Sequence, residues 1–271
     1  MRDQLYDRLD FRLSELEHRY GANVHILSNP FLLTLLASLC AKETIQPAIN
    51  DLVVRIYEDL VKTVINMELP RKQAAVPTRM IDVHPLGVFQ GQVIDRAVRA
   101  VTVNIARAGT LPSQVTYDLL NHLLDPALVR QDHLIMARQV DEKHQVVGSQ
   151  IFGSKIGGDV DDVFLLFPDP MGATGGSMAE AIQWYKDRVP GRPRRIVTMN
   201  LIVTPEYLRR LRDRHPEVVV YAVRLDRGLS PAEVFSTVPG TKWELERGLD
   251  DRQYIVPGGG GFGEIMNNAY V

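Results

Sequence analysis

The stretch that decides the fold of this 271-residue chain is Phe167-Pro168-Asp169-Pro170-Met171-Gly172-Ala173-Thr174-Gly175-Gly176-Ser177. It follows the apolar run 163–166 and precedes a helix predicted from Met178 onward. This order, in which a strand is followed by an acid, a loop of small residues and the start of a helix, suits the binding of a phosphate group. The backbone N–H groups of such a loop and the positive end of the helix dipole both attract an anion.

The residue types inside the loop support this interpretation. Gly175 and Gly176 let the backbone approach an anion closely, because they carry no Cβ. Thr174 and Ser177 add hydroxyl donors to the same loop. Asp169 precedes the loop and is poorly placed for the phosphate itself. It is well placed for donor groups on a sugar attached to that phosphate.

Composition excludes several classes of protein. The 31 basic and 33 acidic residues leave no positive field for generic nucleic-acid binding. Hydrophobic content of 45% and charged content of 24% are typical of a globular protein. The single cysteine, Cys40, rules out an internal disulfide, and we interpret it as a buried, inert thiol. The longest apolar stretch, residues 30–41, is too short to span a membrane. The first 20 residues carry both charge signs, unlike a signal peptide, so we expect a cytoplasmic protein.

Alternating strands and helices predict an α/β fold with a mainly parallel sheet covered by helices on both faces. The predicted strands are 101–105, 133–137, 163–167, 195–203 and 218–225, and helices are predicted over 46–67, 111–124, 178–188 and from 204 onward. In such sheets ligands bind beyond the carboxyl ends of the strands. Arg107 and Arg138 follow the first two strands, so we expect both at the edge that carries the phosphate loop.

We predict one domain over residues 22–271, preceded by an N-terminal helical arm over 1–21. Four leucines at helical spacing among charged residues indicate that arm, namely Leu5, Leu9, Leu13 and Leu16. The polar, glycine-containing segment of about 139–162 is typical of a hairpin or flap that closes over a site.

With these residues in hand, the chain resembles the uracil phosphoribosyltransferase family. That family writes the phosphate loop Asp-Pro-Met-Leu-Ala-Thr-Gly-Gly-Ser. Further matches follow in the family's order over roughly residues 22–263, in the segments 24–30, 106–109, 136–138, 215–218 and 254–258. The resemblance implies a type I phosphoribosyltransferase fold with a flap and a C-terminal hood.

The resemblance also implies a reaction of pyrimidine salvage, in which uracil and phosphoribosyl pyrophosphate give UMP and pyrophosphate. Residues 173–177 (Ala173, Thr174, Gly175, Gly176 and Ser177) would then hold the 5′-phosphate, and Asp169 would bind the ribose hydroxyls. Arg107 and Arg138 would grip the pyrophosphate, with Lys155 closing over the site from the flap. Mg²⁺ is implied as an ion bound through the pyrophosphate rather than by a dedicated protein site. The implied partners are phosphoribosyl pyrophosphate, a pyrimidine base and further copies of the chain, as a homodimer or larger homo-oligomer, with no nucleic acid and no membrane.

The base-binding loop is where the chain departs from the family. Tyr254, Ile255, Gly260 and Phe262 match the segment that reads uracil, largely through main-chain groups. The family's first aspartate in this loop is replaced by Gly261, and its second by a glutamate, Glu264.

Two further departures are an insertion of about 20 residues, 230–249, and Gly172 in place of the family's leucine, which we expect to loosen the phosphate loop. The insertion is interpreted as a hood beside the site or a subunit contact. These departures leave two alternatives open. One is a paralogue that binds phosphoribosyl pyrophosphate or a nucleotide as a regulator, and the other is transfer to a different heterocyclic base.

Three other patterns indicate no further site. Gly258, Gly260 and Gly263 fit G-x-G-x-x-G, but the eight residues that follow leave no room for a dinucleotide-binding unit. The seven histidines show no spacing typical of metal ligands, so no metal-ligating residue is assigned. We interpret the basic run 192–195 as a solvated turn before a strand.

Overall fold

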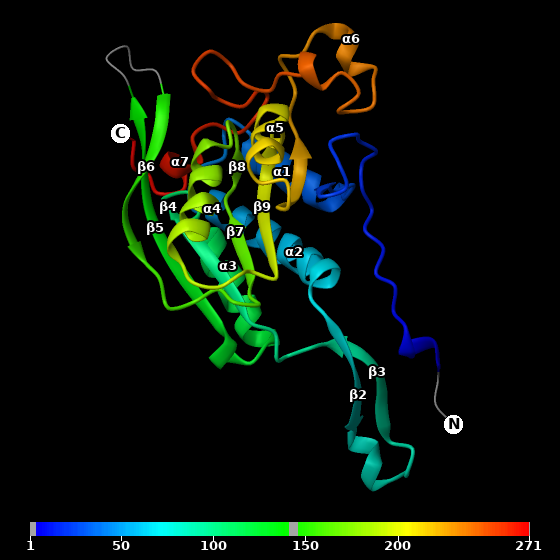
Figure 1. The fold of residues 1–271 in the computed structure, drawn as a ribbon. Coiled ribbons are helices and arrows are strands. Elements are labelled where there is room, and N and C mark those ends of the chain that lie inside the picture. The colour runs from blue at the N-terminus through cyan, green and yellow to red at the C-terminus, as the bar shows by residue number, and fades with distance from the viewer. Residues whose placement is uncertain (1–3, 141–145, 271) are drawn as a thin grey trace.

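The computed structural model describes residues 4–140 and 146–270. In this part of the chain a central sheet runs in the order β1-β10-β9-β7-β4-β5-β6, with β8 beside β9 (Figure 1). Its strands are β1 (Val24–Ile26), β4 (Ala100–Ala106), β5 (Val129–Val140), β6 (Val146–Lys155), β7 (Phe164–Pro168), β8 (Met171–Gly172), β9 (Arg195–Val203) and β10 (Val219–Leu225). Every pairing is parallel except that of β5 with β6. The predicted α/β fold with a mainly parallel sheet is therefore confirmed.

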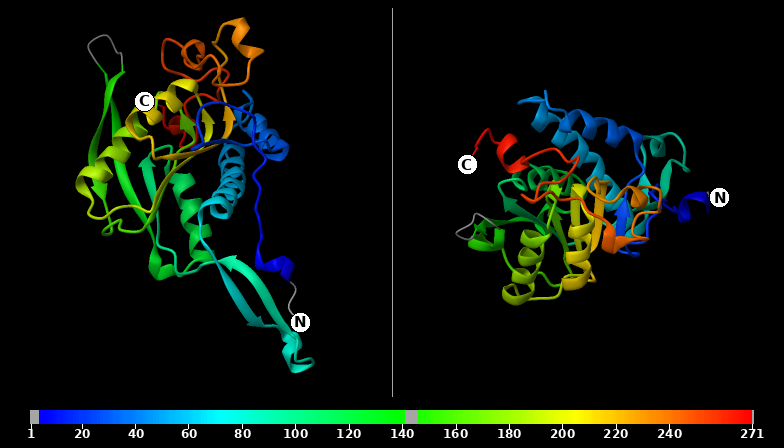
Figure 2. Two further views of the ribbon diagram at one scale, coloured as in Figure 1. Left: turned by 45° about the vertical axis from the view of Figure 1, so that its right-hand side comes forward. Right: turned by 90° about the horizontal axis from the view of Figure 1, so that it is seen from above.

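Helices cover both faces of the sheet, as the view from above shows (Figure 2). One layer contains α1 (Pro30–Cys40), α2 (Ala48–Glu68) and α3 (Thr110–Leu123), and the other contains α4 (Gly176–Arg188) and α5 (Pro205–Arg214). Strand β7 shows why two cores form: Phe164 and Leu166 pack in the first, whereas Leu165 and Phe167 pack in the second. Alternate side chains of a strand point to opposite faces, so a strand buried on both sides reads as a continuous apolar run.

The parallel arrangement brings the ends of β4, β7, β9 and β10 to one edge. The loops after these strands therefore lie together, at the top of Figure 1, with the two short helices α6 (Ala232–Phe235) and α7 (Phe262–Ile265). The flap prediction corresponds to the antiparallel hairpin β5–β6 beside this edge. Residues 141–145, which the flap prediction also includes, lie outside the described residues.

The predicted N-terminal helix is wrong for the described residues. Only Gln4–Asp7 forms a short 3₁₀ turn, η1, and the chain then runs extended. The Leu16 N–H donates to the Ile26 carbonyl (2.9 Å), beside a bridge between Glu15 and Leu27. An isolated amphipathic helix is marginal unless its apolar face is buried. Here the segment instead pairs with the edge strand β1.

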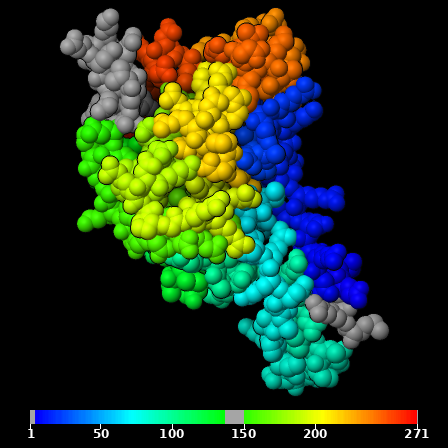
Figure 3. Space-filling model, viewed as in Figure 1, coloured from blue at the N-terminus to red at the C-terminus, as the bar shows by residue number. Residues whose placement is uncertain are grey.

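Several elements were not predicted. The apolar run that begins at Pro30 forms helix α1, capped by Asn29, whose side chain accepts the Leu32 N–H (3.2 Å). A hairpin of β2 (Arg71–Pro77) and β3 (Val88–Ile94), joined through the turn η2 (Arg79–Asp82), projects from the body of the molecule (Figure 3). A third 3₁₀ turn, η3 (Pro126–Leu128), leads into β5, and a fourth, η4 (Trp243–Leu245), lies in the insertion. None of the helices in the described ranges has both the length and the apolar character needed to cross a bilayer.

Candidate active site

The phosphate loop lies where the sequence predicts it, at the carboxyl end of β7. The Asp169 N–H donates to the Met199 carbonyl of β9 (3.0 Å), and the Asn200 amide donates to the Asp169 carbonyl (2.7 Å). These bonds hold the backbone at Asp169 against β9. The Asp169 side chain is half-buried, and its Oδ1 accepts the Met171 N–H (3.2 Å).

Helix α4 begins inside the loop, so its free N–H groups face the place where an anion would bind. Gly175 is the residue before the helix and has φ +73°, a conformation that favours glycine. Thr174 Oγ1 accepts the Gly176 N–H (3.2 Å), and the Ala173 carbonyl accepts a bond from the Thr204 hydroxyl (2.7 Å). Ser177 lies half-buried in the first turn of α4. The loop is thus tied to both β9 and α5.

Gly172 packs closely against Val203 and Tyr207. A methyl group added there would lie 2.9 Å from Val203 Cγ1 and 3.1 Å from the Tyr207 ring. Tyr207 is buried, and its hydroxyl donates to Asn200 Oδ1 (3.1 Å). An aromatic side chain from α5 thus fills the space beside the glycine, and the expected loosening of the loop backbone stays a prediction.

The turn after β4 brings Arg107 to the same edge. A methyl group on Gly109 would lie 3.2 Å from the Pro168 carbonyl, so this turn touches the strand that leads into the phosphate loop. The Ala106–Arg107 peptide bond is cis. The Arg107 side chain is exposed, and its Nη1 donates to the carbonyl of Ala269 (3.1 Å) in the C-terminal segment.

Arg138 and Lys155 belong to the β5–β6 hairpin. The backbone of Arg138 pairs with Ser149, and its side chain lies outside the described residues. Lys155 ends β6 opposite His133 and is exposed. Three strand spacings separate β6 from β7, roughly 14 Å across the sheet, so the structure does not bring Lys155 into contact with Asp169.

The predicted base-binding residues share one loop but have different surroundings. Ile255 and Phe262 are 8% and 2% exposed and anchor the loop in the core. Tyr254 is 42% exposed, and its N–H donates to Asp250 Oδ1 (2.8 Å). Gly260 has φ +84°, and a methyl group there would meet nothing within 4 Å, so its main chain faces open space. This loop also reaches the turn after β4, since a methyl group on Gly263 would lie 3.9 Å from the Ala108 nitrogen.

Asp226, which holds the base loop, was not predicted from the sequence. This side chain is 1% exposed, and its Oδ2 accepts the Gly258 N–H (2.8 Å) while its Oδ1 accepts a bond from Arg224. A second bond joins the Gly228 N–H to the Val256 carbonyl (3.0 Å). An acid directly after a buried strand was the available signal, although its partner is 32 residues further along the chain.

The glutamate of the base loop lies over the position that lacks the family's aspartate. A methyl group on Gly261 would lie 2.0 Å from Glu264 Oε2, so a side chain at 261 and the present Glu264 rotamer exclude each other. The neighbouring Gly259 packs on Cys40, since a methyl group there would lie 2.7 Å from its Sγ. Burial raises the pKa of the Cys40 thiol to about 11, and the Asp226 charge adds to this effect.

The insertion 230–249 packs against the N-terminal segment and α5. Glu246, which is fully buried, accepts bonds from the Tyr20 hydroxyl, Arg227 Nη1 (3.1 Å) and the Gly240 N–H (2.8 Å). Burial, followed by the bond to Glu246, raises the pKa of the Tyr20 hydroxyl. The Trp243 indole N–H donates to the Pro205 carbonyl (3.0 Å) at the start of α5. The insertion is thereby anchored beside the edge that carries the site.

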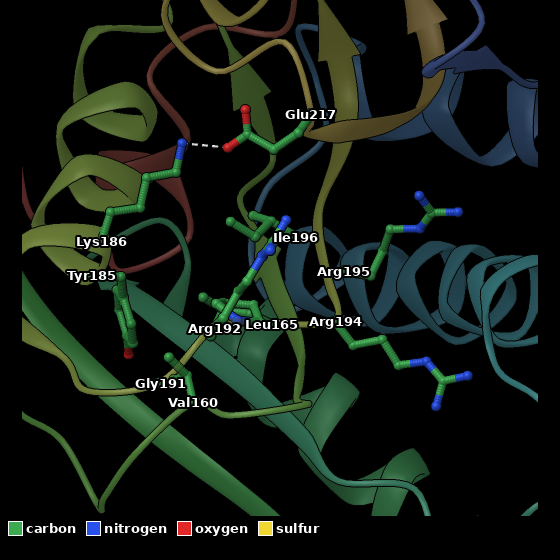
Figure 4. Close-up of a pocket in the computed structure, with 11 residues that line it drawn as sticks. Val160, Leu165, Tyr185, Lys186, Gly191, Arg192, Arg194, Arg195, Ile196 and Glu217 are labelled. Carbon is green, nitrogen blue, oxygen red and sulfur yellow. Dashed lines mark ion pairs between the residues drawn. The ribbon is translucent and has the colours of Figure 1, made fainter.

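A separate cavity of about 590 Å³ lies at the amino ends of β9 and β10, the opposite end of the sheet from the phosphate loop (Figure 4). Two of its charged groups are paired: Lys186 pairs with Glu217 and contacts His215 Nδ1 (2.8 Å), and Arg195 pairs with Glu68 (2.8 Å), which lies outside the lining. Burial lowers the pKa of His215, whose Nε2 lies 2.9 Å from the Ala179 carbonyl. The basic run 192–195 precedes β9 and is largely exposed, as expected for a solvated turn.

Comparisons with known proteins agree on one family. A family model described as uracil phosphoribosyltransferase matches residues 26–242. The chain is 29% identical over 243 residues to a uracil phosphoribosyltransferase from Dictyoglomus thermophilum, covering 90% of this chain and 98% of that protein. It is 27% identical over 244 residues to one from Caldanaerobacter subterraneus subsp. tengcongensis, covering 90% and 97%. The solved structure of the AQ2163 protein from Aquifex aeolicus aligns with a TM-score of 0.68 at 20% identity, covering 92% of this chain and 99% of that one.

The parallel sheet, the loop at its carboxyl edge and the family match define a type I phosphoribosyltransferase. The chain belongs to the uracil phosphoribosyltransferase family. Family and fold support a transferase that uses phosphoribosyl pyrophosphate and a nucleobase.

Proposed function

We propose that this protein transfers the phosphoribosyl group of phosphoribosyl pyrophosphate to uracil, giving UMP and pyrophosphate. The observation that carries the proposal is the phosphate loop 169–177, which joins an acid to a helix N-terminus at the carboxyl edge of the sheet. The family match supports the same reaction. The base loop at the same edge offers main-chain groups around Gly260 for a planar base.

In this reaction the uracil N1 atom bonds to ribose C1, the bond from C1 to the pyrophosphate oxygen breaks, and uracil loses its N1 proton. Positive charge develops on the ribose and negative charge on the leaving pyrophosphate. Catalysis is then mainly positional and electrostatic. Asp169 would accept bonds from the ribose hydroxyls beside the developing positive charge, and the α4 N-terminus would hold the 5′-phosphate. Arg107, at the adjacent turn, supplies a guanidinium suited to two-point contact with the pyrophosphate, and we assign the same role to Arg138.

Mg²⁺ would enter bound to the pyrophosphate. A hard cation of this kind takes oxygen ligands and keeps several waters, so one carboxylate near a phosphate chain suits it. The half-buried Asp169 carboxylate at the start of the phosphate loop fits that requirement. Within residues 4–140 and 146–270 no three His, Cys, Asp or Glu side chains gather as a metal site. The ion would supply charge neutralisation on the leaving group.

The test is a pyrophosphate-release assay with the protein, Mg²⁺, phosphoribosyl pyrophosphate and a panel of bases. Release of pyrophosphate with uracil alone supports the proposal. Release with another base alone would mean that this base, and not uracil, is the substrate. Tight binding of phosphoribosyl pyrophosphate without release for any base would refute it. That result would favour the alternative of a paralogue that binds phosphoribosyl pyrophosphate as a regulator. In such a paralogue the bond from Arg107 to the Ala269 carbonyl would hold the arginine side chain against the C-terminal segment. Asp169→Asn should lower turnover at least a hundredfold while leaving the melting temperature nearly unchanged.

We also propose that the chain forms a homodimer or larger homo-oligomer through the β2–β3 hairpin. Its tip exposes Met80, Val83 and Leu86 at 53%, 77% and 69%. Contiguous exposed apolar side chains on a projecting arm are typical of an interaction surface. Light scattering should report a dimer or larger assembly for the wild type and a monomer for the double variant V83D/L86D. A monomeric wild type would refute this proposal.

A further inference from the structure

An arginine outside every motif matched above lies against the phosphate loop. Arg210 is in the middle of α5, and this helix passes close to the loop because Gly175 has no side chain. A methyl group on Gly175 would lie 3.3 Å from Arg210 Cβ and 3.3 Å from the Tyr207 carbonyl. The guanidinium itself extends along the loop, with Arg210 Nη1 3.8 Å from the position of a methyl group on Gly176.

The charge of Arg210 is available, in contrast to those of its neighbours on the same helix. Arg209 donates to the Trp243 carbonyl, Arg212 donates to Asp213 (2.9 and 2.8 Å), and Arg214 pairs with Glu180 (2.5 Å). Arg210 is exposed, and its side chain has no hydrogen bond or ion pair with the described part of the chain. A guanidinium is never neutral at physiological pH, so it presents a permanent positive charge beside Gly176.

We propose that Arg210 is a further binding residue for the 5′-phosphate of the ribose substrate and of the nucleotide product. The loop supplies N–H groups and the end of a helix dipole, which together amount to about half a positive charge. A 5′-phosphate carries up to two negative charges near neutral pH. The guanidinium of Arg210 lies on the α5 side of the loop and supplies the remaining charge, with a planar fork that can bind two phosphate oxygens. This inference deepens the proposed function and rests on the phosphate loop being the site of that function.

The test is isothermal titration calorimetry with ribose 5-phosphate, a probe that contains the phosphate and the sugar but no base and no leaving group. Arg210→Gln should weaken binding about tenfold or more, the change typical of losing one charge-assisted hydrogen bond. Arg210→Lys should restore part of the affinity, and raising the salt concentration should weaken the wild type more than the glutamine variant. Arg214→Gln is the matched control, because it removes the same charge one turn further along α5 and should leave the affinity within twofold.

Two results would overturn the inference. One is equal binding of ribose 5-phosphate by the wild type and Arg210→Gln with unchanged melting temperatures. The other is an equal loss in Arg210→Gln and Arg214→Gln, which would indicate a general charge effect. A wild type that binds the probe through Arg210 but releases no pyrophosphate with any base would refute the proposed function and leave this inference standing. A wild type that turns over uracil while Arg210→Gln keeps its affinity would refute this inference alone.

Discussion

Asp226 is the residue whose replacement should separate base binding from phosphoribosyl pyrophosphate binding. Asp226 directly follows β10 and is 1% exposed. Its Oδ2 accepts a hydrogen bond from the Gly258 N–H of the base loop. Its other partner, Arg224, has a side chain that is 47% exposed, so this ion pair contributes little to stability. The effect of removing the carboxylate should therefore be concentrated on the base loop.

The magnitude follows from the bond to Gly258. A hydrogen bond to a charged acceptor contributes about 1.5–3 kcal/mol, and Asp226→Ala leaves the Gly258 N–H without its acceptor. Asp226→Asn keeps an oxygen that can accept this N–H and loses the charge, so we expect about 1 kcal/mol. If the free energy lost in Asp226→Ala appears as weaker binding of the base, the KM for uracil should rise about ten- to hundredfold, since 1.4 kcal/mol corresponds to a factor of ten.

The assay is a set of initial rates with uracil and phosphoribosyl pyrophosphate varied separately, combined with urea denaturation. We expect the KM for uracil to rise in the order wild type, Asp226→Asn, Asp226→Ala, with the KM for phosphoribosyl pyrophosphate within about twofold. Arg224→Ala is the control, because it breaks the ion pair and keeps the bond to Gly258. Equal rises in both KM values, or a loss of stability with an unchanged KM for uracil, would refute this reasoning.

Four further outcomes are expected. Gly261→Asp should change the free energy of unfolding by less than about 1 kcal/mol in urea denaturation, because the new side chain meets only the end of the flexible Glu264 side chain, which can rotate away; a larger loss would contradict this packing. Glu246→Ala should destabilise the protein by about 3–5 kcal/mol in urea denaturation, since Arg227, the Tyr20 hydroxyl and the Gly240 N–H all lose the buried carboxylate that they share; a loss below about 1 kcal/mol would show that these groups find water instead. Cys40, with a pKa of about 11, should react with iodoacetamide at pH 8 on the order of a hundredfold more slowly in the folded protein than in urea, and equal rates would contradict its burial. Because burial lowers the pKa of His215, the unfolded state takes up its proton first and stability should fall as pH drops below about 6.5. His215→Gln should flatten that part of a urea-midpoint profile, and an unchanged slope would exclude the histidine as its source.

The order of the strands and helices could be predicted because each local pattern of apolar residues can be buried well in only one kind of secondary structure. The run 163–167 is apolar on both faces, which suits a strand inside a covered parallel sheet, and 196–203 is buried on both faces although it includes Thr198 and Asn200. Thr204 before Pro205 marks the start of α5, and the structure shows Thr204 Oγ1 accepting the Tyr207 N–H (3.0 Å). The position of the loop could be predicted for a related reason, since the proposed phosphate binding depends on backbone N–H groups and on residues adjacent in the chain.

The N-terminal segment shows the limit of such patterns. The spacing of its leucines suits a helix, but helix formation also needs a surface that buries the apolar stripe. Leu5 is 78% exposed, and the chain from Leu16 onward pairs with β1 instead. The β2–β3 hairpin was missed because its strands mix polar and apolar residues without a clear period. Besides each other, these strands contact the N-terminal segment, for example where the Gln73 amide donates to the Asp7 carbonyl (2.8 Å).

By itself, the sequence determined the fold class, the position of the phosphate loop and the place of Asp169 and Arg107 at the strand ends. It also showed that the base loop departs from its family. Only the tertiary structure decided which distant residues support that site: Asp226 beneath Gly258, Tyr207 beside Gly172, and Arg210 beside Gly176. The reason is physical. A strand, a cap or a glycine loop is specified by neighbours along the chain, whereas these contacts depend on how α5 and the base loop pack against the sheet edge.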